Sequence, residues 1–449
     1  MLLTGNVDSR LLAYAEQSAP RYTSYPTAPH FEPAVNGDVY GRWLGELAAD
    51  DSVSLYLHSP YCQQMCFYCG CHAFLAKRDE PIAEYVEAIV REIETVARAS
   101  SAKRVEEIHW GGGTPNTLSA ERFERINAVL RREFDLAEVA RHAIEIDPRI
   151  LSRDQAQTFA RCGVNRASLG VQDLDPQVQA AIGRVQPLEV VAEAVRNLRE
   201  AGIDALSFDL MYGLPYQTIE SVKRTAEQAL ALQPARFSVF GYAHVPWFKT
   251  RQRLMNADAL PGAAQRFELA ETIRDALAAA GYVEIGYDHY ARPDDPIAIA
   301  ASGGGLQRNF QGFVEHACDA LIGLGPSAIS TLPQGYAQNE PEVGAWRAAV
   351  IGGGFATKRG RALTPEDRLR RDLIMRLLCD FRLDLGPYGG AATYQAELNE
   401  LAPLVRDGLA AIEGDVITIP ADARAFARLA AQVFDGYRQQ APARHSVAV

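Results

Sequence analysis

Short apolar runs alternate with longer amphipathic segments from about residue 53 onward. Each run is followed by a turn rich in Gly or Pro, and the longer segments repeat their apolar residues at helical spacing. This alternation is typical of βα units, in which helices connect parallel strands. It predicts six strands, at residues 53–58, 104–110, 142–147, 166–171, 205–213 and 236–242. The connecting helices are expected at residues 81–99, 120–134, 154–161, 188–201 and 219–232.

The predicted fold is therefore α/β, with six parallel strands joined by right-handed helical crossovers. Such strands form either a barrel or an open sheet, and in both forms the chemistry lies at the carboxyl ends of the strands. A further helix at 263–281 leads into the segments YVEIGYDHYARPDD, RNFQGF and LIGLGPSAIST. These segments are expected to extend the barrel or to cover its open end.

Three regions are expected along the chain. Residues 1–50 have no clear periodicity and predict an N-terminal arm, and residues 51–350 hold the barrel with its C-terminal extension. After Gly352–Gly354 the composition changes, and Thr364-Pro365 is a good helix start. Residues 351–449 are thus expected to form a small, mainly helical domain, in which DVITIP is one strand of a hairpin like that of a winged helix.

The composition excludes some partners. The 449 residues carry a formal net charge of −11, so the basic surface expected of a nucleic-acid or anionic-lipid binder is missing. The longest uncharged stretch, residues 320–339, contains three Gly and two Pro and is a poor membrane span. The first residues do not resemble a signal peptide. We therefore expect a cytoplasmic protein that binds neither nucleic acid nor membrane.

Four of the seven cysteines lie between residues 62 and 71, directly after the first predicted strand. Cys62, Cys66 and Cys69 place three thiols on one loop, and three protein ligands leave one iron of a 4Fe–4S cluster open to a cofactor. Zinc normally takes four ligands, and a second C-x2-C pair does not follow. An electron-carrier cluster would need a fourth thiolate, for which Cys71 is available.

The motif C-x3-C-x-aromatic-C after a strand resembles that of radical S-adenosylmethionine enzymes. Across nearly the whole chain, RYTSYPTAPHF, YLHSPYCQQMCFYCGC, HWGGGTP, IEIDPR, FDLMYGLP, RNFQGF and LGPSAIS are similar to the oxygen-independent coproporphyrinogen III oxidase family. The resemblance implies a partial (βα)6 radical-SAM barrel, one 4Fe–4S cluster and two molecules of S-adenosylmethionine. Alternatives in the same superfamily are a haem-binding chaperone paralogue and a radical methyltransferase or cyclopropane-forming enzyme.

The resemblance also implies cofactor-binding residues at the strand ends. Three successive glycines let the backbone approach a ligand closely, and the family places the methionine part of the cofactor there. A second S-adenosylmethionine is expected beside the first, and Ile329 matches a contact to the first adenine. The full set is Tyr56, Tyr68, Gly112, Gly113, Thr114, Glu145, Gln172, Arg184, Asp209, Ala243 and Ile329.

The implied reaction is the oxidative decarboxylation of two propionates of coproporphyrinogen III to vinyl groups, which gives protoporphyrinogen IX in haem biosynthesis. A 5′-deoxyadenosyl radical would remove the hydrogen atom, so no side chain is assigned as acid or base. The substrate carboxylates need cationic partners, and Arg21, Arg292 and Arg308 are candidates for bidentate binding. A flavodoxin-like electron donor and a monomeric state are also expected from the resemblance.

Overall fold

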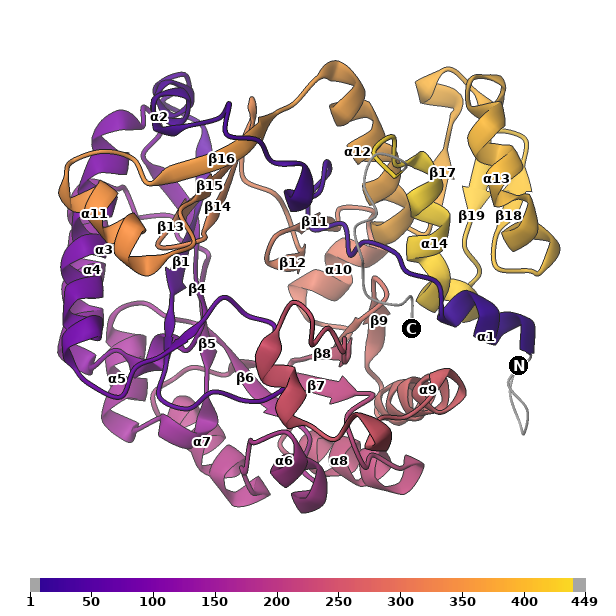
Figure 1. Ribbon diagram of the computed structural model, residues 1–449, viewed down its shortest axis with the longest axis horizontal. Helices are drawn as coiled ribbons and strands as arrows, with labels where there is room; N and C mark the ends of the chain where they lie inside the picture. The colour runs from indigo at the N-terminus through magenta and orange to yellow at the C-terminus, as the bar shows by residue number, and fades with distance from the viewer. Residues whose placement is uncertain (1–8, 439–449) are drawn as a thin grey trace.

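The computed structural model describes residues 9–438. Its main feature is a twelve-stranded sheet whose strands follow the spatial order β16-β15-β14-β13-β1-β4-β5-β6-β7-β8-β10-β9. Seven neighbouring strands, from β13 to β8, run parallel. The sheet curves around a central space, with helices on its outer side (Figure 1). The expected α/β fold with a parallel core is confirmed.

All six predicted parallel strands are present. Their apolar side chains are buried because helices cover the outer face of the sheet. Gly112 ends the second of these strands with a φ of +106°, a conformation that favours glycine. The six strands are β1 (Ser52–Ser59), β4 (Arg104–Gly112), β5 (Arg141–Ile146), β6 (Arg166–Gln172), β7 (Ala205–Tyr212) and β8 (Arg236–Gly241).

The predicted helices also form and connect successive strands on the outside of the sheet. Side chains that cap the first turn mark several of their starts; Ser152 and Thr218, for example, each form a capping box. The predicted helices are α3 (Glu80–Ala99), α4 (Ala120–Glu133), α5 (Arg153–Arg161), α7 (Leu188–Glu200), α8 (Ile219–Ala231) and α9 (Ala263–Ala279), and a short helix that was not predicted, α6 (Pro176–Ala181), precedes α7.

Further strands extend the sheet at both edges, as expected for the later segments. The segment ALIGL forms β13, which pairs in parallel with β1, and β10 pairs antiparallel with β8. The added strands are β9 (Val283–Ile285), β10 (His289–Ala291), β13 (Ala320–Leu324), β14 (Ile329–Leu332), β15 (Gly335–Asn339) and β16 (Thr357–Ala362). Two short pairs, β2–β3 (Tyr61–Cys62 and Phe74–Leu75) and β11–β12 (Gln307–Asn309 and Gly312–Val314), lie outside the sheet.

A second hydrophobic core joins the N-terminal segment to the C-terminal region. Leu11, Tyr22 and Tyr25 pack there with apolar residues between 373 and 434. The strand predicted from DVITIP is present as β19, which pairs with both β17 and β18. The remaining elements are α1 (Ser9–Ala15), α2 (Gly37–Gly45), α10 (Pro296–Ser302), α11 (Val343–Ile351), α12 (Pro365–Cys379), α13 (Gln395–Arg406), α14 (Ala427–Ala431), β17 (Arg382–Asp384), β18 (Ala411–Glu413) and β19 (Val416–Thr418).

The expected three-region division remains a prediction. Strand β16, beyond the expected boundary at residue 350, still pairs with β15 in the large sheet. The C-terminal elements and the N-terminal helix α1 lie together on one side of the molecule, facing the open side of the curved sheet (Figure 1). No helix within residues 9–438 is both long and apolar enough to cross a bilayer.

Candidate active site

The three predicted cluster ligands lie on the loop that follows the carboxyl end of β1. Cys62 ends the short strand β2, and Cys62 and Cys66 are buried while Cys69 is partly exposed. Backbone bonds from Gly113 to Ser59 and from Thr114 to Tyr61 hold this loop against the end of β4. The loop therefore presents its thiols at the end of the sheet where parallel-strand proteins place their chemistry.

Each of the three sulfur atoms accepts a hydrogen bond from the surrounding chain. The Thr114 hydroxyl donates to Cys62 Sγ at 3.1 Å, and the Arg184 guanidinium donates to Cys66 Sγ at 3.3 Å. The backbone N–H of Cys71 donates to Cys69 Sγ at 3.4 Å. Donors aimed at sulfur stabilise thiolates and tune the iron–sulfur clusters that thiolates hold. The loop thus fits a 4Fe–4S cluster bound by three thiolates.

The acidity of the thiols differs along the loop. Burial raises the pKa of Cys62 to about 11, although the Thr114 hydroxyl opposes this shift. A hydrogen bond from the Cys71 side chain lowers the pKa of Cys69 to about 6. Metal binding removes the thiol protons, so iron would have to displace a more tightly held proton from Cys62 than from Cys69.

Two residues that the sequence analysis did not single out complete the surroundings of Cys66. Arg149 forms a two-pronged ion pair with Asp147, with nitrogen–oxygen distances of 2.9 and 2.6 Å, and its Nη2 lies 3.9 Å from Cys66 Sγ. Arg184 also reaches Asp147, at 3.4 Å. Both new residues belong to the motif IEIDPR, so the signal was present in the sequence.

The three glycines after β4 are required by the chain's own close packing. A Cβ on Gly111 would lie 2.7 Å from a carboxylate oxygen of Glu145, and one on Gly112 would lie 2.6 Å from the His58 ring. A Cβ on Gly113 would lie 2.8 Å from the Tyr61 carbonyl oxygen. The glycines therefore allow the cluster loop, β4 and Glu145 to meet, and their contact with a cofactor remains a prediction.

A row of polar side chains crosses the inner face of the sheet from β1 to β10. Strand register places Tyr56 beside His109, Glu145 beside Ser168, and Asp209 beside Ser238, which in turn faces His289. His109 contacts Glu145 at 3.3 Å, and the Ser168 hydroxyl donates to Asp209 at 3.3 Å. The row consists of Tyr56, His109, Glu145, Ser168, Asp209, Ser238 and His289.

Glu145 and Asp209 are the two acidic members of this row. In the described part of the chain neither carboxylate forms an ion pair with Lys or Arg, and the side chain that contacts Glu145 is that of His109. Glu145 also accepts a hydrogen bond from the Gly112 N–H at 3.2 Å. Burial, with the nearby charge of Glu145, raises the pKa of Asp209 to about 6. Both groups are suited to accept hydroxyl or cationic donors from a ligand.

The remaining predicted cofactor residues surround the same end of the sheet. Gln252 donates to the carbonyls of Tyr68 and Ala243 at 3.0 and 3.1 Å, which ties the cluster loop to the segment after β8. Gln172 has a φ of 67° where the β6–β7 register shifts, and Ile329 begins β14. The structure brings these residues to one end of the sheet, and their roles remain predictions.

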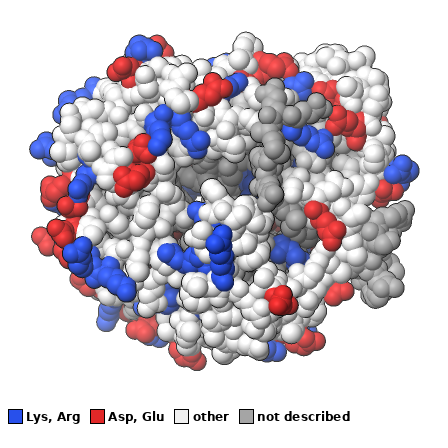
Figure 2. Space-filling model, viewed as in Figure 1, with Lys and Arg blue, Asp and Glu red and all other residues white. Residues whose placement is uncertain are grey.

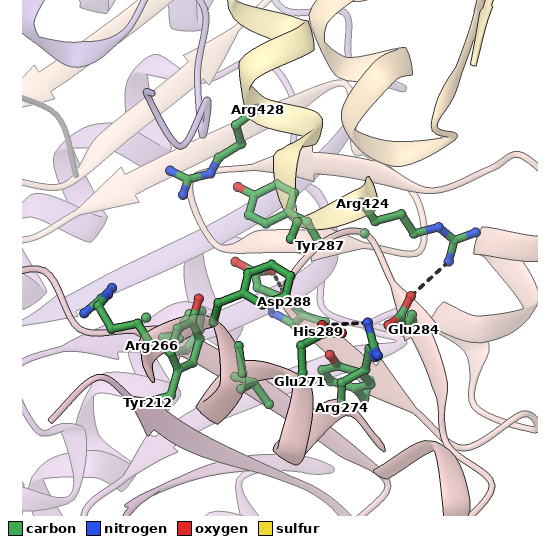
Figure 3. Close-up of a pocket in the computed structure, with 18 of the residues that line it drawn as sticks. Tyr212, Arg266, Glu271, Arg274, Glu284, Tyr287, Asp288, His289, Arg424 and Arg428 are labelled. Atoms are coloured by element: carbon green, nitrogen blue, oxygen red, sulfur yellow. Dashed lines mark hydrogen bonds and ion pairs between the residues drawn. The ribbon is translucent and has the colours of Figure 1, made fainter. Parts of the chain in front are cut away.

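A pocket opens where β7, β8 and β10 meet α9 and the C-terminal region. It encloses about 960 Å³, its open mouth included. The space-filling view is hollowed near its centre, with Lys and Arg side chains nearby (Figure 2). Residues from the arm, the sheet and the C-terminal elements contribute to its lining (Figure 3). Its five arginines are Arg21, Arg266, Arg274, Arg424 and Arg428.

Comparison with known proteins identifies the family. Residues 56–229 match the radical SAM superfamily. The chain is 46% identical to the oxygen-independent coproporphyrinogen III oxidase of Bradyrhizobium diazoefficiens, over 98% of this chain and 99% of that protein. The corresponding protein of Paracoccus denitrificans is 40% identical, over 98% of both chains. The chain belongs to the oxygen-independent coproporphyrinogen III oxidase family.

A solved structure of this family has the same fold. The coproporphyrinogen III oxidase of Escherichia coli, a radical SAM enzyme, matches with a TM-score of 0.88 and 36% sequence identity. The match covers 94% of this chain and all of that chain. The predicted radical-SAM fold and family are confirmed, and the family implies a 4Fe–4S cluster and S-adenosylmethionine for this chain.

Of the three arginines proposed from the family motifs, Arg21 and Arg308 lie together and Arg292 lies apart from them. Arg21 lines the pocket, where its Nη2 donates to the Gly241 carbonyl at 3.3 Å. Arg308 Nε donates to the Arg21 carbonyl, and its guanidinium lies over the Phe313 ring. Arg292 instead lies beside Ala235, before the start of β8, with a half-exposed side chain 3.5 Å from Asp294. Arg292 is therefore a poor candidate for substrate binding, because the opposite end of β8 faces the pocket.

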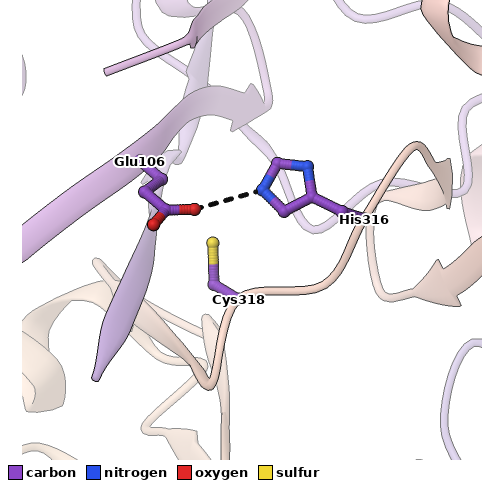
Figure 4. A group of neighbouring side chains, drawn as sticks. All are labelled: Glu106, His316 and Cys318. Atoms are coloured by element: carbon purple, nitrogen blue, oxygen red, sulfur yellow. Dashed lines mark ion pairs between the residues drawn. The ribbon is translucent and has the colours of Figure 1, made fainter. Parts of the chain in front are cut away.

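Three side chains of types that can bind a metal lie near the amino end of β4, at the opposite end of that strand from the cysteine loop. His316 Nε2 lies 3.3 Å from Glu106 Oε2, and the Cys318 sulfur is close to both (Figure 4). His316 is largely exposed, and Arg104 also pairs with Glu106. The contacts are those of a surface ion-pair cluster, and we assign it no role in the reaction.

Proposed function

We propose that this chain converts coproporphyrinogen III to protoporphyrinogen IX without oxygen, as a radical S-adenosylmethionine enzyme of haem biosynthesis. The observation that carries the proposal is the combination, at one end of the sheet, of three hydrogen-bonded thiols and an arginine-lined pocket in a chain of this family. Two propionates lose carbon dioxide and become vinyl groups.

The cluster residues would be Cys62, Cys66 and Cys69. When bound, the reduced cluster supplies the electron that cleaves S-adenosylmethionine to methionine and a 5′-deoxyadenosyl radical. The chain's own residues bind, orient and bury the reactants, because no proton transfer to a side chain is needed in the hydrogen-atom step. The deoxyadenosyl radical would take a hydrogen atom from the propionate β-carbon and become 5′-deoxyadenosine, and loss of carbon dioxide with transfer of one electron to an external electron acceptor would leave the vinyl group.

Two S-adenosylmethionine sites are part of the proposal. For the first, the strand-end positions of the glycine run and of Glu145 support contact with the methionine part and with ribose or amine donors. For the second, the absence of a Lys or Arg partner for Asp209 within residues 9–438 supports a cationic or hydroxyl ligand there. The proposed contacts are Tyr56, Tyr68, Gly112, Gly113, Thr114, Glu145 and Ile329 around the first molecule, and Gln172, Arg184, Asp209 and Ala243 around the second.

The electron source, oligomeric state and location are also proposals. A reducing donor is required because each cofactor cleavage consumes an electron, and a flavodoxin-like protein would meet this need. Family resemblance favours a monomer, and the close-spaced cysteines, which do not look like a disulfide framework, favour the reducing cytoplasm.

The test is an anaerobic assay of the reconstituted enzyme with reductant, S-adenosylmethionine and coproporphyrinogen III. Mass spectrometry follows the tetrapyrrole and 5′-deoxyadenosine. Loss of two carboxyl groups with release of deoxyadenosine supports the oxidase. Cofactor cleavage with an unchanged tetrapyrrole would instead favour the haem-binding paralogue or another radical substrate.

A further inference from the structure

The segment that follows β8 covers the cysteine loop directly. The side chain of Gln252 is buried and donates to the Tyr68 carbonyl at 3.0 Å. Lys249 Nζ donates to the Cys71 carbonyl at 3.2 Å. These two contacts come from the start of, and from within, the short 3-10 helix η4 (Thr250–Leu254). Residues 248–254 therefore form a layer in direct contact with the loop that carries the proposed cluster ligands.

This layer exposes large apolar side chains. The exposed fraction is 75% for Phe248 and 65% for Leu254. Val185 is also exposed, on the loop after α6, and Arg184 next to it donates to Cys66 Sγ. Exposed apolar residues gathered in one region of a folded protein mark interaction sites more often than isolated ones do.

The same layer reverses the charge of the chain. The whole sequence has a formal net charge of −11, yet residues 243–260 contain Lys249, Arg251 and Arg253 and a single acidic residue, Asp258. None of the three basic side chains forms an ion pair with a carboxylate of residues 9–438. In Figure 2, Lys and Arg side chains gather near the centre of the view, where Figure 1 shows the segment between β8 and α9.

The combination of exposed apolar and basic side chains favours an acidic protein as the partner. Electron-transfer complexes have small interfaces, and complementary charge speeds and orients their formation. An acidic partner would be repelled by much of this acidic chain and attracted to the basic layer. Its docking there would bring its redox group to the side of the molecule on which the cysteine loop lies.

We propose that Phe248, Arg251, Arg253 and Leu254, here called the 248–254 patch, dock the acidic, flavin-containing protein that donates electrons to this enzyme. The assignment rests on the proposed function, in which each cleavage of S-adenosylmethionine consumes one electron. The donor loses that electron, and no proton or chemical group passes between the two proteins.

The test compares the reconstituted enzyme with an Arg251→Glu/Arg253→Glu double variant, with reduced flavodoxin as the probe. Calorimetric titration measures the Kd of the complex, and release of 5′-deoxyadenosine measures KM for flavodoxin. Both should rise by about tenfold or more, because charge attraction becomes repulsion. Added salt should weaken the wild-type complex and have less effect on the variant. With photoreduced deazaflavin, a small reductant that needs no docking, deoxyadenosine release should equal that of wild type.

Two further variants separate docking from net charge and from folding. Arg196→Glu/Arg382→Glu makes the same change in net charge at two exposed arginines of α7 and β17, and it should leave Kd and KM for flavodoxin unchanged. Phe248→Ser keeps every charge and should weaken the complex without changing its salt dependence. Iron content and circular dichroism check the fold of each variant.

Several results would overturn the assignment. A Kd and a KM within twofold of wild type in the double variant would exclude the patch as the docking surface. Equal loss with flavodoxin and with deazaflavin would show that these arginines support the cluster or the fold instead. A wild-type enzyme that deazaflavin reduces and flavodoxin does not would exclude this class of donor. By contrast, a wild-type enzyme that releases deoxyadenosine with flavodoxin but forms no vinyl product would refute the proposed oxidase function and leave the docking surface standing.

Discussion

The two ends of the parallel sheet differ in whether their acidic side chains form ion pairs with arginine. At the amino ends, Arg141 contacts Glu107 at 2.7 Å and Glu315 at 2.6 Å, while Arg236 pairs with both Glu315 and Asp295. At the carboxyl ends, Glu145 and Asp209 form no ion pair with Lys or Arg within residues 9–438. The charged groups at the amino ends pair with one another, whereas these two carboxylates at the carboxyl ends have no Lys or Arg partner in the described residues.

This contrast distinguishes charged side chains that stabilise the fold from charged side chains that we infer bind ligands. A buried charge is costly unless it is paired, so a network closed on itself serves the fold. Asp209 at the other end carries the same kind of cost, because burial raises the pKa of its carboxyl group. We infer that this cost is offset when cofactor and substrate bind, and four predictions test the comparison.

The largest effect, a loss of the cluster and of enzyme activity, is expected from Cys66→Ser at the carboxyl end of the sheet. Cys66 Sγ accepts from Arg184 at 3.3 Å and is one of three thiolates proposed for the cluster. Without it the cluster should be lost and no vinyl product should form, while the fold persists. Iron and sulfide analysis, with the anaerobic assay, measures both. Cys162→Ser, which changes a buried cysteine outside the loop, is the control, and an active, iron-loaded Cys66→Ser enzyme would exclude this cysteine as a required ligand.

The next largest effect is on stability, from Glu315→Gln at the amino end. This change leaves Arg141 and Arg236 short of a partner, and breaking a buried pair costs about 3–5 kcal/mol. Arg236 and Arg141 lower the pKa of Glu315 to about 2, against the opposing effect of burial. Because the folded-state pKa is depressed, the stabilisation is present above about pH 4.5 and is lost as the pH falls toward 2.

Urea unfolding of the cofactor-free protein at pH 7 measures this loss. The difference between wild type and Glu315→Gln should shrink as the pH is lowered. A loss below about 1 kcal/mol at pH 7, the size expected of an exposed ion pair, would mean that the amino-end network contributes little to stability.

A smaller change in the free energy of unfolding, an increase rather than a loss, is expected from Asp209→Asn at the carboxyl end. Burial and the charge of Glu145 raise the pKa of Asp209 to about 6, above its unfolded value, so this carboxylate destabilises the folded, cofactor-free protein as the pH rises through that range. The Asn variant should therefore be more stable by about 1–2 kcal/mol at pH 8. Near pH 3.5 this advantage should vanish.

The same variant should lose function. Removing the charge should weaken binding of S-adenosylmethionine, so stability and activity change in opposite directions. Urea unfolding at the two pH values and equilibrium dialysis with labelled cofactor measure the two effects. Glu284→Gln, which changes a carboxylate already paired with Arg424, is the matched control and should not gain stability. Lower stability of Asp209→Asn at pH 8 would contradict the comparison.

The sequence predicted one part of this contrast well. Local periodicity located the six strands and their helices, and the spacing of Cys62, Cys66 and Cys69 located the loop at the end of β1. Of the five pocket arginines, only Arg21 was named from a sequence motif, and the other four could not be found in this way. Arg266 belongs to α9, Arg428 to α14 and Arg21 to the arm, and only tertiary packing brings them together. The amino-end network is equally non-local, since Glu315 reaches β5 and β8 from a distant loop.

The smallest effect is expected from Cys71→Ser, which tests whether the cluster loop supplies three ligands or four. The backbone N–H of Cys71 donates to Cys69 Sγ, and serine retains that N–H. The serine hydroxyl can also replace the thiol of Cys71, whose hydrogen bond lowers the pKa of Cys69. Iron content and vinyl formation should therefore stay close to wild type. Loss of the cluster would show that Cys71 is a fourth ligand, which would close the open iron and favour an electron carrier. Retention leaves one iron for the cofactor, as the three-thiolate loop requires.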